Sequence, residues 1–232
     1  MTTFTQVLDG LLARDPGRPL VTFYDDATGE RTELSVTTYA NWVAKTASLL
    51  GDELGLEAGD RLLVDLPAHW LGTVVLGAAW TVGLEVVWDG PHDAVCTGPE
   101  GLARWADEAA GVPVVASALL PLAGRFPDGV PAGVHDLGTE VWGQPDAYVA
   151  WPGADDDTLA AAGTTHATLW AAAAARPEAE GRRLLTRSNP ASPDGLGDLT
   201  AALVGRGSLV LAVHASPERL DGIASDERAV RS

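Results

Sequence analysis

Three consecutive carboxylates, Asp155, Asp156 and Asp157, form the longest acidic run of the 232-residue sequence. They follow residues 147–151, whose apolar pattern predicts a β-strand, so the run would lie at the end of a strand. Oxygen ligands of this kind suit Mg²⁺ or Ca²⁺. Three successive side chains do not converge on one point, however, and the sequence shows no second set of ligands. We therefore expect no metal site, and a solvated acidic turn is the simpler interpretation.

Catalytic patterns are equally sparse. Asp155 and Asp157 fit the D-x-D of a haloacid-dehalogenase-type phosphatase, but Thr158 comes one position too early for that motif. Nucleophilic catalysis by serine needs a sharp turn of the G-x-S-x-G type, which the sequence lacks. His214 and Ser216 follow a predicted strand, and Ser216 is better explained as the cap of the next helix. The phosphate-binding pattern G-x-x-x-x-G-K-[ST] is absent too, so we expect no catalytic residues.

Periodic apolar patterns predict the elements that would position these residues. Helices are expected at residues 4–13, 39–54, 69–82, 99–110, 166–180 and 195–206. Strands are expected at residues 20–24, 31–35, 61–66, 84–88, 94–97, 112–116, 147–151 and 208–213. The Gly-, Pro- and Asp-rich residues 117–146 indicate a long irregular connection, and the charged tail after Asp226 is expected to fray.

The alternation of strands and helices indicates an α/β fold with a parallel-rich sheet flanked by helices. Residues 61–66 are almost entirely apolar, as in a strand buried on both faces. Thr37 or Thr38 is expected to cap the helix after the first hairpin, and Gly83 to end the helix at 69–82. No linker divides the chain, so residues 1–232 are expected to form a single domain.

Composition limits the partners of such a domain. The formal net charge of −17 disfavours nucleic acids and anionic membranes, because like charges repel. No apolar run of about 18 residues is present to span a membrane, and the N-terminus lacks the pattern of a signal peptide. Cys96 is the single cysteine, which excludes an intramolecular disulfide and predicts a buried, inert thiol. We expect a cytoplasmic protein.

Residues 56–87 contain a predicted strand and a predicted helix. Gly59 and Asp60 precede the strand, Pro67 follows it, and Gly83 ends the helix. Together with residues 18–50, 148–169 and 184–212, this pattern resembles the N-terminal region of the AMP-binding, adenylate-forming superfamily, which includes acyl-CoA synthetases, adenylation domains and luciferases. The sequence also resembles an uncharacterised family of short actinobacterial proteins that are distantly similar to these enzymes. Both resemblances imply the first subdomain of the adenylate-forming fold.

Residues 148–169 cover the loop with which members of this superfamily hold ATP. Their pattern is S-S-G-T-T-G-x-P-K-G followed by T-H-x-x-L, in which small residues, hydroxyls and a lysine surround the triphosphate. The present sequence fits it without a gap, with Thr165 and His166 at the T-H positions. The resemblance equates a small residue, two threonines, a glycine and the lysine with Gly153, Asp155, Asp156, Asp157 and Ala160.

In this loop, hydrogen-bond donors have become acceptors, and three negative charges stand where a triphosphate would lie. Each unscreened like-charge contact at about 4 Å costs roughly 1–4 kcal/mol, depending on the local dielectric. We therefore expect a degenerate nucleotide loop that binds no cofactor. The superfamily's later elements, including its C-terminal lysine domain, would lie beyond Ser232.

The resemblance and the altered loop together predict a non-catalytic homologue that acts in protein interaction or regulation. A domain without the rest of such an enzyme would expose surface. Core packing is the default interpretation of the eight tryptophans, and the alternative is that some form an association surface, because tryptophan favours interfaces. Self-association or a protein partner is therefore expected. The alternative is a ligase-like enzyme, or a binder of acyl or nucleotide ligands, that uses a modified pocket.

Overall fold

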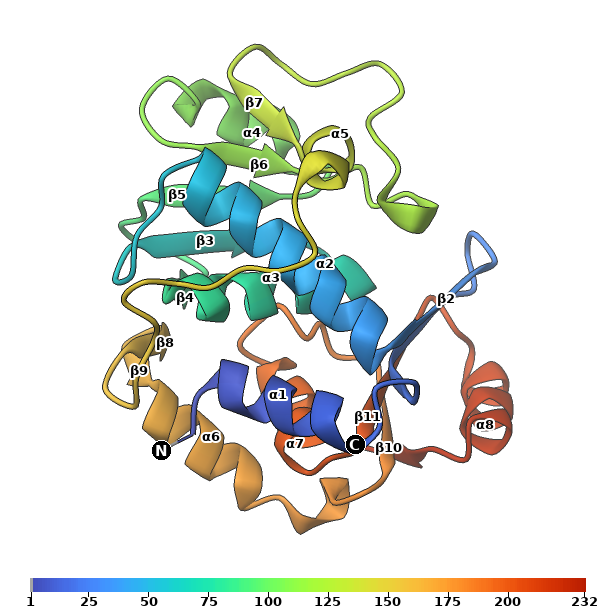
Figure 1. Ribbon diagram of the computed structural model, residues 1–232. Helices are drawn as coiled ribbons and strands as arrows, with labels where there is room; N and C mark the ends of the chain where they lie inside the picture. The colour runs from blue at the N-terminus through green and yellow to red at the C-terminus, as the bar shows by residue number, and fades with distance from the viewer. Residues whose placement is uncertain (1) are drawn as a thin grey trace.

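The computed structural model describes residues 2–232, whose strands form two sheets (Figure 1). The larger sheet has seven strands in the order β7-β6-β5-β3-β4-β8-β9, and the smaller has five in the order β12-β10-β11-β1-β2. Neighbouring strands are parallel except in the hairpins β1–β2 and β8–β9. The predicted α/β class is confirmed, while the division into two sheets was not foreseen.

The elements have the following bounds. The strands are β1 (Pro19–Asp25), β2 (Glu30–Ser35), β3 (Arg61–Asp65), β4 (Glu85–Val87), β5 (Ala94–Thr97), β6 (Val114–Ala116), β7 (Val134–Asp136), β8 (Leu159–Ala161), β9 (Thr164–Thr165), β10 (Arg183–Thr186), β11 (Ser208–Val213) and β12 (Val230–Arg231). The α-helices are α1 (Phe4–Arg14), α2 (Val36–Ser48), α3 (Trp70–Val82), α4 (Leu102–Trp105), α5 (Leu137–Glu140), α6 (His166–Ala174), α7 (Leu196–Val204) and α8 (Pro217–Asp226).

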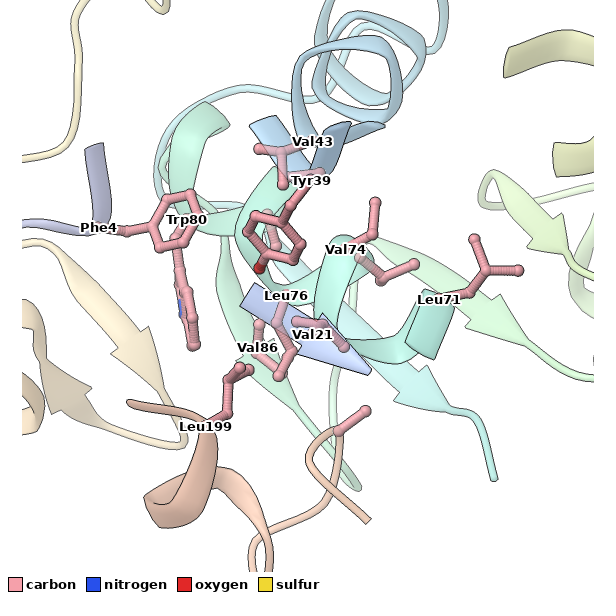
Figure 2. Packing of buried hydrophobic residues seen from close by; sticks show 14 of the residues in the cluster. Phe4, Val21, Tyr39, Val43, Leu71, Val74, Leu76, Trp80, Val86 and Leu199 are labelled. Carbon is pink, nitrogen blue, oxygen red and sulfur yellow. The ribbon is translucent and has the colours of Figure 1, made fainter. Parts of the chain in front are cut away.

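Helix α3 lies at the centre of the core. It is apolar and buried nearly all round, which is the pattern of a helix enclosed by other elements. Figure 2 shows Val74 and Leu76 of α3 near Val21 of β1, Val86 of β4 and Leu199 of α7. One continuous buried cluster therefore contains residues of both sheets.

An aromatic group joins α1 to this core. The ring of Phe4 lies 5.5 Å from that of Trp80 and 6.3 Å from that of Trp170. All three side chains are almost completely buried. The hydroxyl of Thr3 accepts the amide of Gln6 and caps α1, which fixes the helix that carries Phe4. The first and sixth α-helices are thus held together through Trp80 of α3.

Several predicted boundaries were wrong. Ser35, rather than Thr37 or Thr38, caps α2, because β2 leads directly into the helix and Val36 is already buried. The helix expected at 99–110 is α4 followed by a 3₁₀ turn, Ala106–Glu108. The helix expected at 166–180 ends at Ala174, before Pro177, whose ring cannot continue it.

Two segments are more regular than expected. The connection at 117–146 contains β7 and α5, which are too short to give a periodic signal. The tail after Asp226 does not fray, because Val230 and Arg231 pair in parallel with Leu184 and Leu185 of β10. Within residues 2–232, no helix is long and apolar enough to cross a membrane.

Candidate functional site: the acidic loop

The acidic loop, residues 152–158, lies between an irregular segment and the β8–β9 hairpin. Strand β8 extends the seven-stranded sheet by pairing with β4, with Ala161 opposite Val86. Two backbone bonds join the loop to the start of α6: the amide of His166 donates to the carbonyl of Thr158 at 2.9 Å, and that of Ala167 to Asp156 at 3.0 Å. The start of α6, which follows the loop in the sequence, thus holds the loop in place.

The strand predicted at 147–151 is absent. The sheet edge beside β4 is taken by β8, so the earlier segment has no strand to pair with. It runs along α2 and the π-helical turn Leu49–Glu53 instead, where Lys45 forms an ion pair with Asp146 and the Tyr148 ring covers Gly51. Val149 and Trp151 are 88% and 97% exposed as a result.

Asp155 occupies the donors of its own loop. One oxygen of its carboxylate accepts the amides of Asp157 and Thr158, at 3.1 and 2.9 Å, and the hydroxyl of Thr158 at 2.8 Å. The Thr158 hydroxyl also accepts the amide of Asp155. The hydroxyl bond, followed by the amide bonds, lowers the pKa of Asp155, because each favours the ionised form. These are the kinds of donors that a bound phosphate would need.

Asp156 and Asp157 do not combine with Asp155 into a cation site. Asp156 accepts the amide of Thr2 at 2.8 Å, which ties the N-terminal segment to the loop. Asp157 is exposed. Among residues 2–232 no group of three or more His, Cys, Asp or Glu side chains is arranged to hold a metal ion.

Ala160 stands at the position that the resemblance equates with the nucleotide-binding lysine. Its side chain is fully buried, and its carbonyl accepts the indole N–H of Trp80 at 2.9 Å. The neighbouring Leu159 is 39% exposed. A lysine at position 160 would therefore point into the apolar core instead of towards the loop.

Gly153 has no steric role in the loop. It is exposed, and the nearest atom that an added Cβ would meet is the carbonyl oxygen of Ala150 at 3.8 Å. A glycine that allowed close approach of a phosphate would be compatible with this openness, but Asp155 already accepts the amides of Asp157 and Thr158 further along the loop.

A hollow of about 530 Å³ remains beside the loop. Pro152, Trp151 and Tyr148 form one wall, and its charged lining residues are Asp52 and Glu57. Such a lining is apolar and acidic, so it favours neither a triphosphate nor an acyl-CoA. We name it the Trp151 groove.

His166 begins α6, as expected. Its Nδ1 accepts the indole N–H of Trp170 at 3.1 Å, while its Nε2 is buried without a hydrogen-bond partner. Burial lowers the pKa of His166 to about 4, against smaller opposite effects of Asp155 and Asp156. The imidazole is therefore neutral at physiological pH and serves as packing under the loop.

The remaining sequence candidates are structural. Ser216 caps α8 by accepting the amide of Arg219, as predicted. His69, which was expected to begin the helix at 69–82, instead caps α3 through its Nδ1, which accepts the amide of Leu71 at 3.2 Å. Burial raises the pKa of the Cys96 thiol to about 12, which makes it unreactive at neutral pH.

Sequence reasoning missed a charged network on the five-stranded sheet. Glu227 accepts the hydroxyl of Tyr24, and its two oxygens lie 3.0 and 2.8 Å from guanidinium nitrogens of Arg31 and Arg183. These residues come from β1, β2, β10 and the end of α8. Only the order of the strands brings them together, so no local spacing in the sequence could have found them.

Solved structures of other proteins show which class of fold the chain has. The fold is that of the N-terminal domain of AMP-binding, acyl-CoA synthetase-like enzymes. Apo MatB from Rhodopseudomonas palustris matches 99% of the chain with a TM-score of 0.74 at 17% identity. Coronafacic acid ligase from Pectobacterium brasiliense matches 98% with a TM-score of 0.77 at 11% identity. The chain spans about half of these structures, 48% and 49%.

The N-terminal domain of FACL13 from Mycobacterium tuberculosis is also similar, with a TM-score of 0.73 at 14% identity over 99% of this chain and 62% of that one. No protein-family model matches the sequence. A TIGR03089 family protein of Mycobacterium tuberculosis (strain ATCC 25618 / H37Rv) is 38% identical over 235 residues, which cover 97% of this chain and 95% of that protein. The chain belongs to the TIGR03089 family.

Proposed function

We propose that this protein is a non-catalytic relative of the acyl-CoA synthetase-like enzymes, which binds another protein or a second copy of itself and no longer activates acids with ATP. The observation that carries the proposal is the carboxylate of Asp155, which accepts three hydrogen bonds from its own loop. A triphosphate would have to displace that carboxylate and approach Asp156 and Asp157, while the lysine position is buried alanine.

The Trp151 groove supports the interaction half of the proposal. Trp151 and Val149 present large apolar side chains to solvent at its edge, 97% and 88% exposed, and adjacent exposed apolar side chains are typical of interaction surfaces. Tryptophan is a frequent anchor of protein interfaces because it buries a large area with little loss of side-chain freedom. A protein surface that covers this segment would remove both side chains from water.

Amide NMR during a titration with MgATP tests the lost nucleotide site. We expect no saturable shifts at residues 153–158 and no rise in melting temperature that depends on this loop. Saturable shifts confined to 153–158, or a rise of several degrees with an acyl-adenylate analogue, would overturn the non-catalytic proposal in favour of a ligand-binding one.

Light scattering and affinity capture test the interaction half. We expect the wild type to self-associate at high concentration or to retain a defined protein, and the Val149→Ala/Trp151→Ala variant to lose that association. Leu122→Ala is the control, because Leu122 is 73% exposed but lies outside the groove. A monomer that retains the same proteins with and without these substitutions would contradict it.

A further inference from the structure

Four arginines lie at the amino ends of the parallel strands of the five-stranded sheet. Strands β1, β11, β10 and β12 run parallel, so their amino ends lie at the same edge. Each of the four is preceded, within two residues, by an arginine: Arg18, Arg206, Arg182 and Arg228, respectively. Adjacent strands lie about 4.8 Å apart, so the backbone positions of these four arginines follow one another across the amino ends of the strands in an otherwise acidic protein.

These arginines are poorly compensated. The chain has 15 Lys and Arg against 32 Asp and Glu, so most basic side chains could find a carboxylate. Arg182, Arg206 and Arg228 are nevertheless exposed, and within residues 2–232 none of them forms an ion pair. Arg18 donates from Nη1 to the carbonyl of Gly207 at 2.8 Å, while its Nη2 is buried without a hydrogen-bond partner.

A pocket of about 540 Å³ opens between two of these strand starts. Arg182, Arg183 and Arg228 line it, together with the carboxylates of Asp226 and Glu227. Glu227 is already neutralised, because its oxygens contact Arg31, Arg183 and the hydroxyl of Tyr24. We name this hollow the amino-edge pocket.

Arg183 contributes positive charge to this site, and its donors are either occupied or buried. Its Nη2 bonds to Glu227 at 2.8 Å and to the Thr22 hydroxyl at 2.7 Å, but its Nε is buried without a partner. The backbone amides of Gly181, Arg182 and Arg228 are occupied by carbonyls of Gly205, Ala179 and Ser225. Guanidinium groups, not main-chain amides, are therefore the donors that this pocket offers.

We propose that the amino-edge pocket binds the phosphate group of a small anionic molecule. The guanidinium groups of Arg182 and Arg228 could each bond to two oxygens of one phosphate. A carboxylate has only two oxygens and could not bond to both groups in this way. The net charge of the chain repels anions at long range, so a local cluster of arginines is what would make such binding possible.

This site is separate from the acidic loop. The amino-edge pocket belongs to the five-stranded sheet, and the acidic loop to the seven-stranded sheet. Binding at the pocket would give the non-catalytic protein a ligand of its own, and does not require that the loop be active or inactive.

Calorimetric titration with inorganic pyrophosphate in the absence of Mg²⁺ tests the site, with amide NMR to map it. We expect saturable binding, with shifts at 181–183 and 226–230. Arg182→Ala/Arg228→Ala should weaken it at least about tenfold, because two charge-assisted contacts are lost. The control, Arg125→Ala/Arg187→Ala, removes two exposed arginines elsewhere and should change the affinity less than about twofold.

Three results would overturn this inference. They are the absence of saturable pyrophosphate binding to the wild type, equal weakening by both pairs of substitutions, and equal affinity for succinate, which would show a general anion effect. Shifts at 153–158 would contradict the proposed function instead, so the two proposals fail separately. Circular dichroism of each variant confirms that the exposed substitutions leave the fold intact.

Discussion

The acidic loop and the amino-edge pocket differ in whether their hydrogen-bond donors already have an acidic partner. In the loop, Asp155 supplies the acceptor that the amides of Asp157 and Thr158 need. At the pocket, Arg182 and Arg228 form no ion pair with any of the residues 2–232. Asp155 thus already bonds two amides of the acidic loop, whereas the proposed anion site on the other sheet has guanidinium groups without ion pairs.

This difference shows that resemblance of fold and availability of donors are independent properties. A loop can resemble a ligand-binding loop in sequence while one of its own carboxylates already accepts several of its donors. A site for an anion can conversely arise from strand order alone. Ancestry predicts the first region, and only the three-dimensional arrangement reveals the second.

The largest effect should come from a lysine at position 160, which the resemblance equates with the nucleotide-binding lysine. Ala160→Lys would place an ammonium group at a fully buried position. Because burial can shift the pKa of a lysine by about 3–5 units, at 1.36 kcal/mol each, we expect a loss of about 4 kcal/mol in the free energy of unfolding. Urea unfolding at neutral pH measures it.

Leu159→Lys is the matched control, since Leu159 is 39% exposed and adjacent. It should lose less than about 1 kcal/mol, because its ammonium group can reach water. Equally small losses for both variants would show that a side chain at position 160 can reach the loop and water. The contrast between the loop, whose amides already bond to Asp155, and the pocket, whose arginines have no ion pair, would then weaken.

The second prediction concerns pH. Burial holds the pKa of His166 at about 4, against 6.5 for a free histidine, so the unfolded chain binds a proton more readily than the folded one. Stability from this group is therefore full above about pH 6.5 and declines as the pH falls towards 4. The difference amounts to about 3 kcal/mol. His166→Gln should remove that part of the decline in urea unfolding series between pH 4 and 7.

Ala167→Gln provides the comparison for His166, because Ala167 follows it on α6, is exposed and would gain no titratable group. It should keep the wild-type slope between pH 4 and 6.5. If His166→Gln also retained that slope, the protonation of His166 would not be coupled to the fold.

Much of the fold was predictable because its signals are local. The first hairpin, strand β5 at 94–97, strand β11 at 208–213 and the buried helix before Gly83 agree with the apolar patterns. Gly83 has a φ of 96°, a conformation that glycine adopts without strain, and its position in the sequence indicated the helix end. Periodicity and caps act over a few residues and are readable in one dimension.

The failures arose where a neighbour distant in sequence decides. Val149 and Trp151 have the side chains of a strand, but β8 takes the available sheet edge. Likewise, Asp155 could be recognised as a changed donor position, yet its bonds to Thr158 depend on the turn that the loop adopts. The arginines before four strands are scattered from Arg18 to Arg228, and only the sheet order makes them neighbours.

The third prediction sharpens the description of the pocket. Glu227→Gln removes a negative charge beside Arg183, so pyrophosphate should bind about threefold more tightly. The same change leaves Arg31 and Arg183 with a weaker partner and should lower the free energy of unfolding by about 1–2 kcal/mol. Calorimetry and urea unfolding measure the two effects on one variant.

The pH dependence of Glu227 has a definite sign. Burial alone would raise its pKa, but the hydroxyl of Tyr24 and the arginines Arg31 and Arg183 hold the pKa below the usual range. Its stability contribution is therefore present above about pH 4.5 and lost as the pH falls through the lowered value. Glu227→Gln should make this acid decline shallower.

Asp226→Asn is the control for Glu227→Gln, since Asp226 lines the same pocket but takes no part in the network. It should strengthen pyrophosphate binding to a similar degree and leave the stability nearly unchanged. Destabilisation of equal size by both substitutions would mean that charge at the pocket, rather than the contacts of Glu227 with Arg31 and Arg183, supports the fold.

The smallest effect is expected at the loop itself. Asp155→Ala removes the acceptor of the Asp157 and Thr158 amides, so both should exchange with deuterium faster than in the wild type, with little change in global unfolding. Asp157→Ala is the control, because the Asp157 side chain is exposed and does not accept the Thr158 amide. Hydrogen exchange followed by NMR resolves the two amides.

Asp155→Ala should still show no MgATP-dependent shifts at 153–158. Asp156 and Asp157 keep their charges, and residue 160 still offers no cation, so free amides alone do not restore an anion site. Unchanged exchange in this variant would mean that something other than Asp155 shields the amides. Loop shifts with MgATP would mean that one carboxylate alone keeps the nucleotide out, and that the loop differs from the amino-edge pocket by a single side chain.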